Sequence, residues 1–131
     1  MGQKPDISGH RLETLIAALL VAVTLAVFAR ACSYGFVNYD DGDYVYQNRD
    51  VLQGLSVRAA LWALTTTEMV NWHPVTWLSH TIDCQLYGLS PVGHHLTNSI
   101  IHTLNAILLF FMLRGLTGAT WRSGFIAGLF L

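Results

Sequence analysis

The sequence predicts an all-α integral membrane protein. Of its 131 residues, 53% are hydrophobic and 11% are charged, whereas an average soluble domain has about 25% charged residues. Two apolar stretches, residues 12–31 and 91–113, are long enough to cross a hydrocarbon core of about 30 Å as helices. The intervening residues, 32–90, contain two short amphipathic helical patterns. This length supports one domain at most.

The first span, residues 12–31, has one acidic residue near its start and one basic residue near its end. Glu13 and Arg30 are placed where long side chains reach the headgroups. A cleaved signal peptide is the competing interpretation, because Ala29-Arg30-Ala31 resembles a cleavage site and residues 1–11 are basic. The second apolar stretch favours retention as a membrane helix.

The second span, residues 91–113, begins at Ser90-Pro91, which reads as an N-cap followed by the first helical residue. Asn98, His102 and Asn105 recur at helical spacing and form a polar stripe. Polar groups are costly in hydrocarbon, so the stripe is expected to face a bundle interior. Helix–helix hydrogen bonding and a substrate-lining role both remain open.

Basic residues predict the orientation. Residues 114–122 are expected to form a short loop, and 123–131 to begin a third span that continues beyond this sequence. By the positive-inside rule, residues 1–11 form a cytoplasmic tail, 114–122 are also cytoplasmic, and 32–90 form the outer loop. The basic residues of the tail and short loop are Lys4, Arg11, Arg114 and Arg122, against Arg49 and Arg58 in the long loop.

The outer loop contains two predicted amphipathic helices, near residues 56–67 and 74–87. Their apolar faces, Val57, Ala60, Leu61 and Leu64 in the first and Val75, Leu78, Ile82 and Leu86 in the second, lie among several tryptophans. Short helices of this kind next to spanning segments tend to lie in the membrane interface. Earlier in the loop, Asp40-Asp41-Gly42-Asp43 has turn chemistry, with Gly42 able to take a positive φ.

Asp40 and Asp41 are the first candidates for chemistry. Adjacent carboxylates repel, so one of them can hold a proton near neutrality and act as a general base toward a hydroxyl. A divalent cation is also compatible with the pair. A purely structural turn or helix cap is the alternative on spacing alone.

The histidines do not have the spacing of a metal site, so no metal ligands are predicted. One or two of them, like Arg49 or Arg58, are candidates for contacting an anionic group. Cys32 and Cys84 are interpreted as independent residues, and a disulfide between them stays open if both lie outside the membrane in an oxidising compartment. A net charge of −1 gives no indication of nucleic-acid binding. The candidate set among the histidines is His73, His80, His94, His95 and His102.

Three motifs together resemble a known family. They are FVNYDDGDYVYQN, the helix start W-H-P-x-T-W, and G-x-x-P-x-G-H-H-L-x-N entering the second span. Over about residues 12–131, the chain resembles the N-terminal membrane region of bacterial multi-spanning proteins with C-terminal tetratricopeptide repeats. These are similar to the eukaryotic transmembrane and tetratricopeptide-repeat O-mannosyltransferases, of the GT-C class of glycosyltransferases.

The resemblance implies a partial GT-C-like helical bundle, with interfacial helices in the first outer loop, in a bacterial inner membrane. It implies that Asp40 and Asp41 are catalytic, one of them as the base. The donor would be a polyprenyl-phosphate-linked sugar within the membrane lipids, and the acceptor a protein or glycan hydroxyl. Residues expected to contact substrate are His73, Arg49, His94, Asn98 and His102.

The chain departs from the eukaryotic members in one motif, because His73-Pro74 stands where they tend to carry Arg-Pro. As a fragment, the chain is expected to be inactive alone. Two other functions remain open: a non-catalytic membrane scaffold with tetratricopeptide repeats, and a transporter that uses the polar stripe as a pathway.

Overall fold

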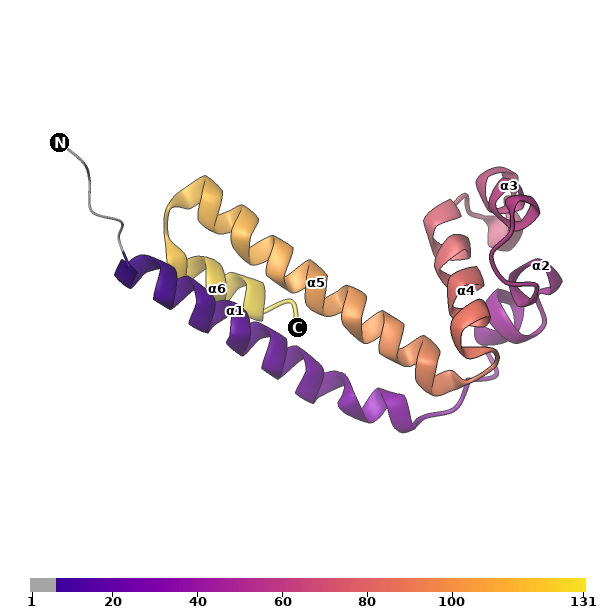
Figure 1. Cartoon of the computed structure of the whole chain (residues 1–131), viewed down its shortest axis with the longest axis horizontal. Coiled ribbons are helices and arrows are strands. Elements are labelled where there is room, and N and C mark those ends of the chain that lie inside the picture. Colours follow the sequence, from indigo (N-terminus) through magenta and orange to yellow (C-terminus); the bar gives the residue numbers. More distant parts are fainter. Residues whose placement is uncertain (1–6) are drawn as a thin grey trace. The chain divides into compact units, whose positions relative to one another are not determined.

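The computed structural model describes residues 7–131, and this range contains helices and no strands. The chain divides into two compact units, one formed by residues up to Arg30 together with Asn98–Leu131, the other by Ala31–Thr97. Figure 1 shows the elements: α1 (Ile7–Phe28), η1 (Ala29–Ser33), η2 (Gly42–Tyr46), α2 (Arg49–Leu52), α3 (Val57–Thr65), η3 (Glu68–Val70), α4 (Pro74–Tyr87), α5 (Pro91–Thr117) and α6 (Thr120–Gly128).

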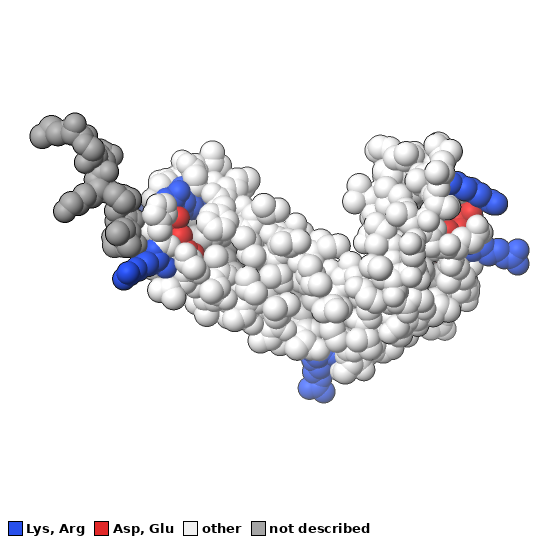
Figure 2. All heavy atoms as spheres, in the orientation of Figure 1, with Lys and Arg blue, Asp and Glu red and all other residues white. Residues whose placement is uncertain are grey.

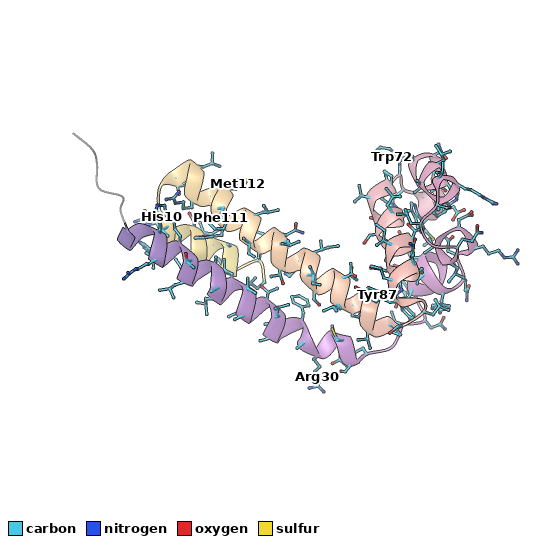
Figure 3. All side chains as sticks on the ribbon, viewed as in Figure 1. His10, Arg30, Trp72, Tyr87, Phe111 and Met112 are labelled. Carbon is cyan, nitrogen blue, oxygen red and sulfur yellow. The ribbon has the colours of Figure 1, made fainter. Side chains whose placement is uncertain are left out.

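Two helical segments are long and apolar enough to cross a membrane, judged by length and composition. They are Gly9–Ser33, with 25 residues, and Pro91–Thr117, with 27. In the most apolar 18 residues of each segment, 11% and 22% of the residues are buried. Most of these apolar side chains therefore face outward. In the view of Figure 2, the surface over the middle of α1 and α5 shows no charged side chain, and Arg30, labelled in Figure 3, projects from η1 beyond the end of α1.

The first unit is held together by small residues of α6 that pack on α1. Leu20, Phe110 and Ala127 form its buried apolar core. A Cβ atom added to Gly124 would lie 2.5 Å from Cγ2 of Ile16, which is closer than van der Waals contact allows. Small residues let helices approach closely where no hydrophobic driving force exists between them, as in a bilayer.

An ion pair joins one end of α1 to the end of α5. The guanidinium of Arg114 contacts the carboxylate of Glu13, whose side chain is 12% exposed. His10 lies 3.6 Å from the same carboxylate. The N-terminal end of α1 and the C-terminal end of α5 therefore lie at the same end of the first unit.

The helix bounds in this part of the chain differ from the predicted bounds of the short loop and the third span. Helix α5 continues to Thr117, and α6 begins at Thr120, so the connection is Gly118 and Ala119 rather than residues 114–122. The apolar pattern weakens after Arg114, but backbone hydrogen bonding needs no apolar side chain and the helix continues. Gly118 ends it with a φ of +67°, a conformation that glycine adopts without strain.

In the predicted tail, residues 1–6 lie outside the described residues, and residues 7–11 are helical and belong to α1. In the polar stripe of α5, Asn98 and Asn105 are exposed, and His102 is half-buried with its ring 4.9 Å from that of Phe28. Of these three residues, the described chain packs only His102, and the expectation that the stripe faces a bundle interior stays a prediction.

The second unit has its own core around α4. Its buried members are Val45, Val51, Ala63, Trp77 and Cys84. Helices α2 and α3 begin with side-chain caps: Asn48 accepts hydrogen bonds from two backbone N–H groups of α2, and Ser56 accepts one from Ala59 at 3.0 Å. Such caps stabilise a helix by about 1 kcal/mol each. Cys32 and Cys84 are both free.

Helices α3 and α4 occur where the sequence predicts two short helices, and the residues that they bury within the unit differ from those of the aliphatic stripes. Helix α4 buries Trp77, Thr81 and Cys84, whereas aliphatic residues of both helices are exposed. An exposed aliphatic stripe beside a buried aromatic face is the arrangement expected of a helix that meets a second apolar environment. The exposed aliphatic residues are Val57, Leu61, Leu64, Val75, Ile82 and Leu86.

Candidate functional site: a histidine and aspartate cluster

Asp41 directly precedes the π-helix η2, and its side chain closes the turn before it. Its Oδ2 atom accepts a hydrogen bond of 2.8 Å from the backbone N–H of Val37. Asp41 is half-buried, whereas Asp40 is exposed. The structure therefore distinguishes the two adjacent carboxylates: Asp41 is drawn into the unit and Asp40 faces outward.

Gly42 does not adopt the positive φ that the turn chemistry predicts. It is buried at the start of η2, and its φ is not among the positive values in the described residues. A Cβ atom added here would lie 3.2 Å from the hydroxyl of Tyr46. Close packing against Tyr46, rather than backbone conformation, makes this position suited to glycine.

Tyr44 connects η2 to helix α4 through stacked rings. Its ring centroid lies 4.9 Å from that of Trp77 and 5.5 Å from that of His73. The ring of His80 meets it edge-on at 6.1 Å. Because aromatic pairs contribute about 0.5–1.5 kcal/mol beyond their burial, this stack fixes the segment that carries Asp41 against the helix that carries the histidines.

A group of three titratable side chains lies at the turn between α4 and α5. His80 and Asp83 are three residues apart on one face of α4, and His94 is in the first turn of α5. One potential ligand atom from each of them lies within 4.8 Å of the other two. Figure 3 labels Tyr87 in the last turn of α4, just before this connection. The turn brings His94 close to Asp83 and His80, which are eleven and fourteen positions earlier in the sequence.

Asp83 is the most unusual member, because its carboxylate is almost completely buried at 2% exposure. Its Oδ1 atom accepts a hydrogen bond of 2.7 Å from the hydroxyl of Thr97. Its Oδ2 atom lies 3.7 Å from Nδ1 of His94, which is longer than a hydrogen bond. Burying an ionised carboxylate is costly unless its charge is compensated.

His94 has a fixed orientation. Its Nε2 atom lies 3.1 Å from the carbonyl oxygen of Gly88, so in the neutral ring Nε2–H donates to this carbonyl and Nδ1 carries the lone pair. Nδ1 is buried and has no hydrogen-bond partner in the described part of the chain. The ring of Phe36 packs edge-on against His94 at 5.4 Å.

Burial lowers the pKa of His80 below its ordinary value, and the carboxylate of Asp83 opposes this shift. His94 lowers the pKa of His80 further, Asp41 raises it, and His73 lowers it. These groups therefore share one electrostatic environment around His80. Because the imidazole of His80 is held neutral, its lone pair remains available at neutral pH.

Burial also raises the pKa of the Cys84 thiol, and the neighbouring Asp83 carboxylate adds to the shift. Cys84 is therefore kept as a neutral thiol that packs in the core of the second unit. A thiolate is the form that attacks or binds metal, so this position is structural in the state described.

The structure brings together some of the predicted site residues and not others. Asp41, His73 and His94 are all near His80. Arg49 is exposed on α2 and lines a different, polar groove of about 540 Å³. Asn98 and His102 belong to the first unit.

Sequence-based reasoning missed Asp83 and Thr97. The signal available was the i, i+3 spacing of His80 and Asp83, which places both on one helix face once the helix from Pro74 is accepted. The pairing with His94 depends on the chain reversal at residues 88–90, and no spacing rule predicts that reversal. The sequence and structure match no known protein family, characterised protein or solved structure.

Proposed function

We propose that this chain forms the first membrane helices and outer loop of a GT-C-type glycosyltransferase. The enzyme would transfer a sugar from a polyprenyl-phosphate donor to a protein or glycan hydroxyl. The observation that supports this proposal best is the position of Asp41. It is half-buried beside the pKa-perturbed His80, in a helical unit that joins two segments able to cross a membrane.

In this proposal, Asp41 is the general base. Its carboxylate takes the proton of the acceptor hydroxyl as the acceptor oxygen bonds to the anomeric carbon, and the lipid phosphate leaves with the bonding electrons. The hydrogen bond from Val37 uses one carboxylate oxygen and orients the group. Asp40 is exposed and would contribute charge rather than receive the proton.

His73 is the proposed contact for the lipid phosphate. Its Nε2 atom is buried and has no hydrogen-bond partner within the described residues, so a ligand oxygen would satisfy it. A buried polar atom without a partner costs about 1–3 kcal/mol. The exposed aliphatic stripes of α3 and α4 would rest in the outer leaflet, from which a lipid-linked donor arrives.

The proposed topology is a multi-pass protein of a bacterial inner membrane with a cytoplasmic N-terminus. The ion pair of Glu13 and Arg114 supports it, because it holds the start of the first span and the end of the second at one end of their unit. Two crossings in opposite directions give this arrangement. Membrane lipids are then the immediate partners of α1 and α5.

This topology predicts the accessibility of two introduced cysteines in a background with Cys32→Ser and Cys84→Ala. Asn38→Cys, in the loop before η2, should react with a membrane-impermeant maleimide in intact cells. Leu116→Cys, at the end of α5 and 77% exposed, should react only after the cells are opened. Labelling of Leu116→Cys in intact cells, with Asn38→Cys protected, would reverse the orientation.

The catalytic role predicts that Asp41→Asn lowers sugar transfer by about 10²–10⁴-fold, the contribution of a general base. The assay is transfer from a polyprenyl-phosphate sugar in membranes that contain the natural protein carrying this sequence. Asp43→Asn is the matched control, because Asp43 is an exposed carboxylate two residues away and should retain activity.

Expression and membrane insertion of both variants are measured in parallel. Transfer that persists in Asp41→Asn would refute the catalytic role and leave Asp41 as the cap of the Val37 turn. The membrane scaffold would then be the better hypothesis, because a scaffold needs the loop to fold and needs no base.

A further inference from the structure

We propose that His80, Asp83 and His94 form a binding site for one divalent transition-metal ion, with Zn²⁺ as the preferred ion. The inference does not depend on the proposed transferase. It rests on the geometry of three side chains in the second unit and on the groups that hold them in place.

The ligand types suit zinc. Two imidazole nitrogens and a carboxylate oxygen bind Zn²⁺ at about 2.0–2.2 Å in tetrahedral sites, which places ligand atoms about 3.3–3.5 Å apart. The 3.7 Å between Oδ2 of Asp83 and Nδ1 of His94 is already close to this value. The three atoms lie within 4.8 Å of one another, so the side chains would move closer together to bind a common ion at these distances.

Each histidine of the cluster has one ring nitrogen without a hydrogen-bond partner in residues 7–131. Nδ1 of His80 and Nδ1 of His94 are buried and accept no hydrogen bond from the described residues. Each of these nitrogens carries a lone pair when its ring is neutral with the proton on Nε2. A cation between the two nitrogens and the buried Asp83 carboxylate would compensate the negative charge and satisfy both lone pairs.

Two hydrogen bonds with neighbouring residues orient the ligands, as is common in metal sites. The carbonyl of Gly88 accepts from Nε2–H of His94, and the hydroxyl of Thr97 donates to the Asp83 oxygen that does not face His94. Metal-binding histidines and carboxylates are commonly held by such bonds, and loss of one lowers affinity by about 10–100-fold.

A hydrogen-bonded His94–Asp83 ion pair explains the cluster less well. At 3.7 Å the pair is longer than the 2.7–3.2 Å of an N–H···O bond, and His80 would have no role in it. Three protein ligands leave a fourth position for water or substrate, the arrangement of catalytic rather than structural zinc sites. Asp41 and His73 are the nearby groups whose charges reach His80.

The test is zinc binding by the whole chain in detergent micelles after removal of metal with a chelator. We expect one Zn²⁺ per chain, measured by competition with a chromophoric chelator, and the intense visible absorption of tetrahedral Co²⁺ when cobalt replaces zinc. His94→Ala, His80→Ala and Asp83→Asn should each weaken binding by about 100-fold or more. Cys84→Ala and His10→Ala should not change it.

A second pair of variants separates loss of the site from loss of the fold. Thr97→Val removes the hydroxyl that orients Asp83 and keeps the shape of the side chain, so affinity should fall by about 10–100-fold with unchanged helix content. Thr97→Ser keeps the hydroxyl and should bind as the wild type does. Binding of no zinc by the wild-type chain, or equal binding by all these variants, would overturn the proposal.

Discussion

Replacing Trp77 with alanine should open the second unit and make Cys84 at least about 100-fold more reactive toward a thiol reagent. Trp77 is fully buried and packs against Tyr44, Trp62 and His73. Removing a buried tryptophan side chain costs about 3–5 kcal/mol, and each 1.4 kcal/mol changes an opening equilibrium about tenfold. Because Cys84 lies in the same core, its labelling rate reports that opening directly.

The measurement uses the chain in micelles with Cys32→Ser, so that labelling comes from Cys84 alone. Trp72→Ala is the matched control: Trp72 is 65% exposed, and its indole N–H donates to the carbonyl of Leu64 at 2.9 Å. Loss of that bond costs about 1 kcal/mol, which predicts less than a tenfold change. The rate of Cys84 labelling in Trp77→Ala should also rise with denaturant concentration, because labelling then requires the unit to unfold. A thiol that is merely uncovered in the folded unit would show no such dependence.

Equal acceleration by both substitutions would mean that Trp77 does not organise this core. The stack of Tyr44 on Trp77 would then be incidental, and so would the attachment of the Asp41 segment to α4. The experiment therefore tests whether the packing around Trp77 holds the candidate site in place, independently of any assay for sugar transfer or zinc binding.

The helix starts at Pro74 and Pro91 were the most predictable features of the fold. Proline lacks the N–H that a first helical turn leaves unpaired, and its φ suits that position, so a local rule suffices. The end of α5 was less predictable. Gly118 is a strong signal for a helix end. The hydrophobic pattern, however, already weakens at the polar residues before Gly118, so that pattern predicts an earlier end.

The face of α4 that forms the core of the second unit could not be predicted from the sequence, for a physical reason. The aliphatic stripe of Val75, Ile82 and Leu86 gives the stronger periodic signal, but periodicity shows that a face is apolar and does not show what covers it. Here the core is formed by the face that carries Trp77 and Cys84. Where a helix carries two apolar faces, the sequence does not decide which of them forms the core.

The candidate site also has one part that local sequence signals indicate and one part that they do not. Asp41 was a candidate from the sequence, because adjacent carboxylates are a local signal. The cluster of His80, Asp83 and His94 was not, because it needs the turn at Gly88, whose φ is +60°, to bring the first turn of α5 close to α4. Asp83 resembles any surface aspartate in the sequence, and only tertiary structure reveals its burial.

Gly93→Ala should destabilise the second unit, whereas the same substitution at Gly115 of the same helix should not. A Cβ atom added to Gly93 would overlap the ring of Tyr87 and lie 2.5 Å from its Cβ atom, while nothing lies within 4 Å of one added to Gly115. Overpacking costs about 1–3 kcal/mol, and an unobstructed Gly→Ala change within a helix gains about 0.5–1 kcal/mol.

The measurement for Gly93→Ala is again Cys84 labelling, with an expected rise of about fivefold to 100-fold. For Gly115→Ala, thermal loss of helix should move to equal or higher temperature. Tyr87→Ala should not rescue Gly93→Ala, because the Tyr87 Cβ atom is itself too close; Tyr87→Gly removes that atom and should restore part of the stability. Rescue by both variants alike, or by neither, would show that α4 and α5 do not meet as closely as the turn at residues 88–90 requires. His94 would then not be held beside Asp83.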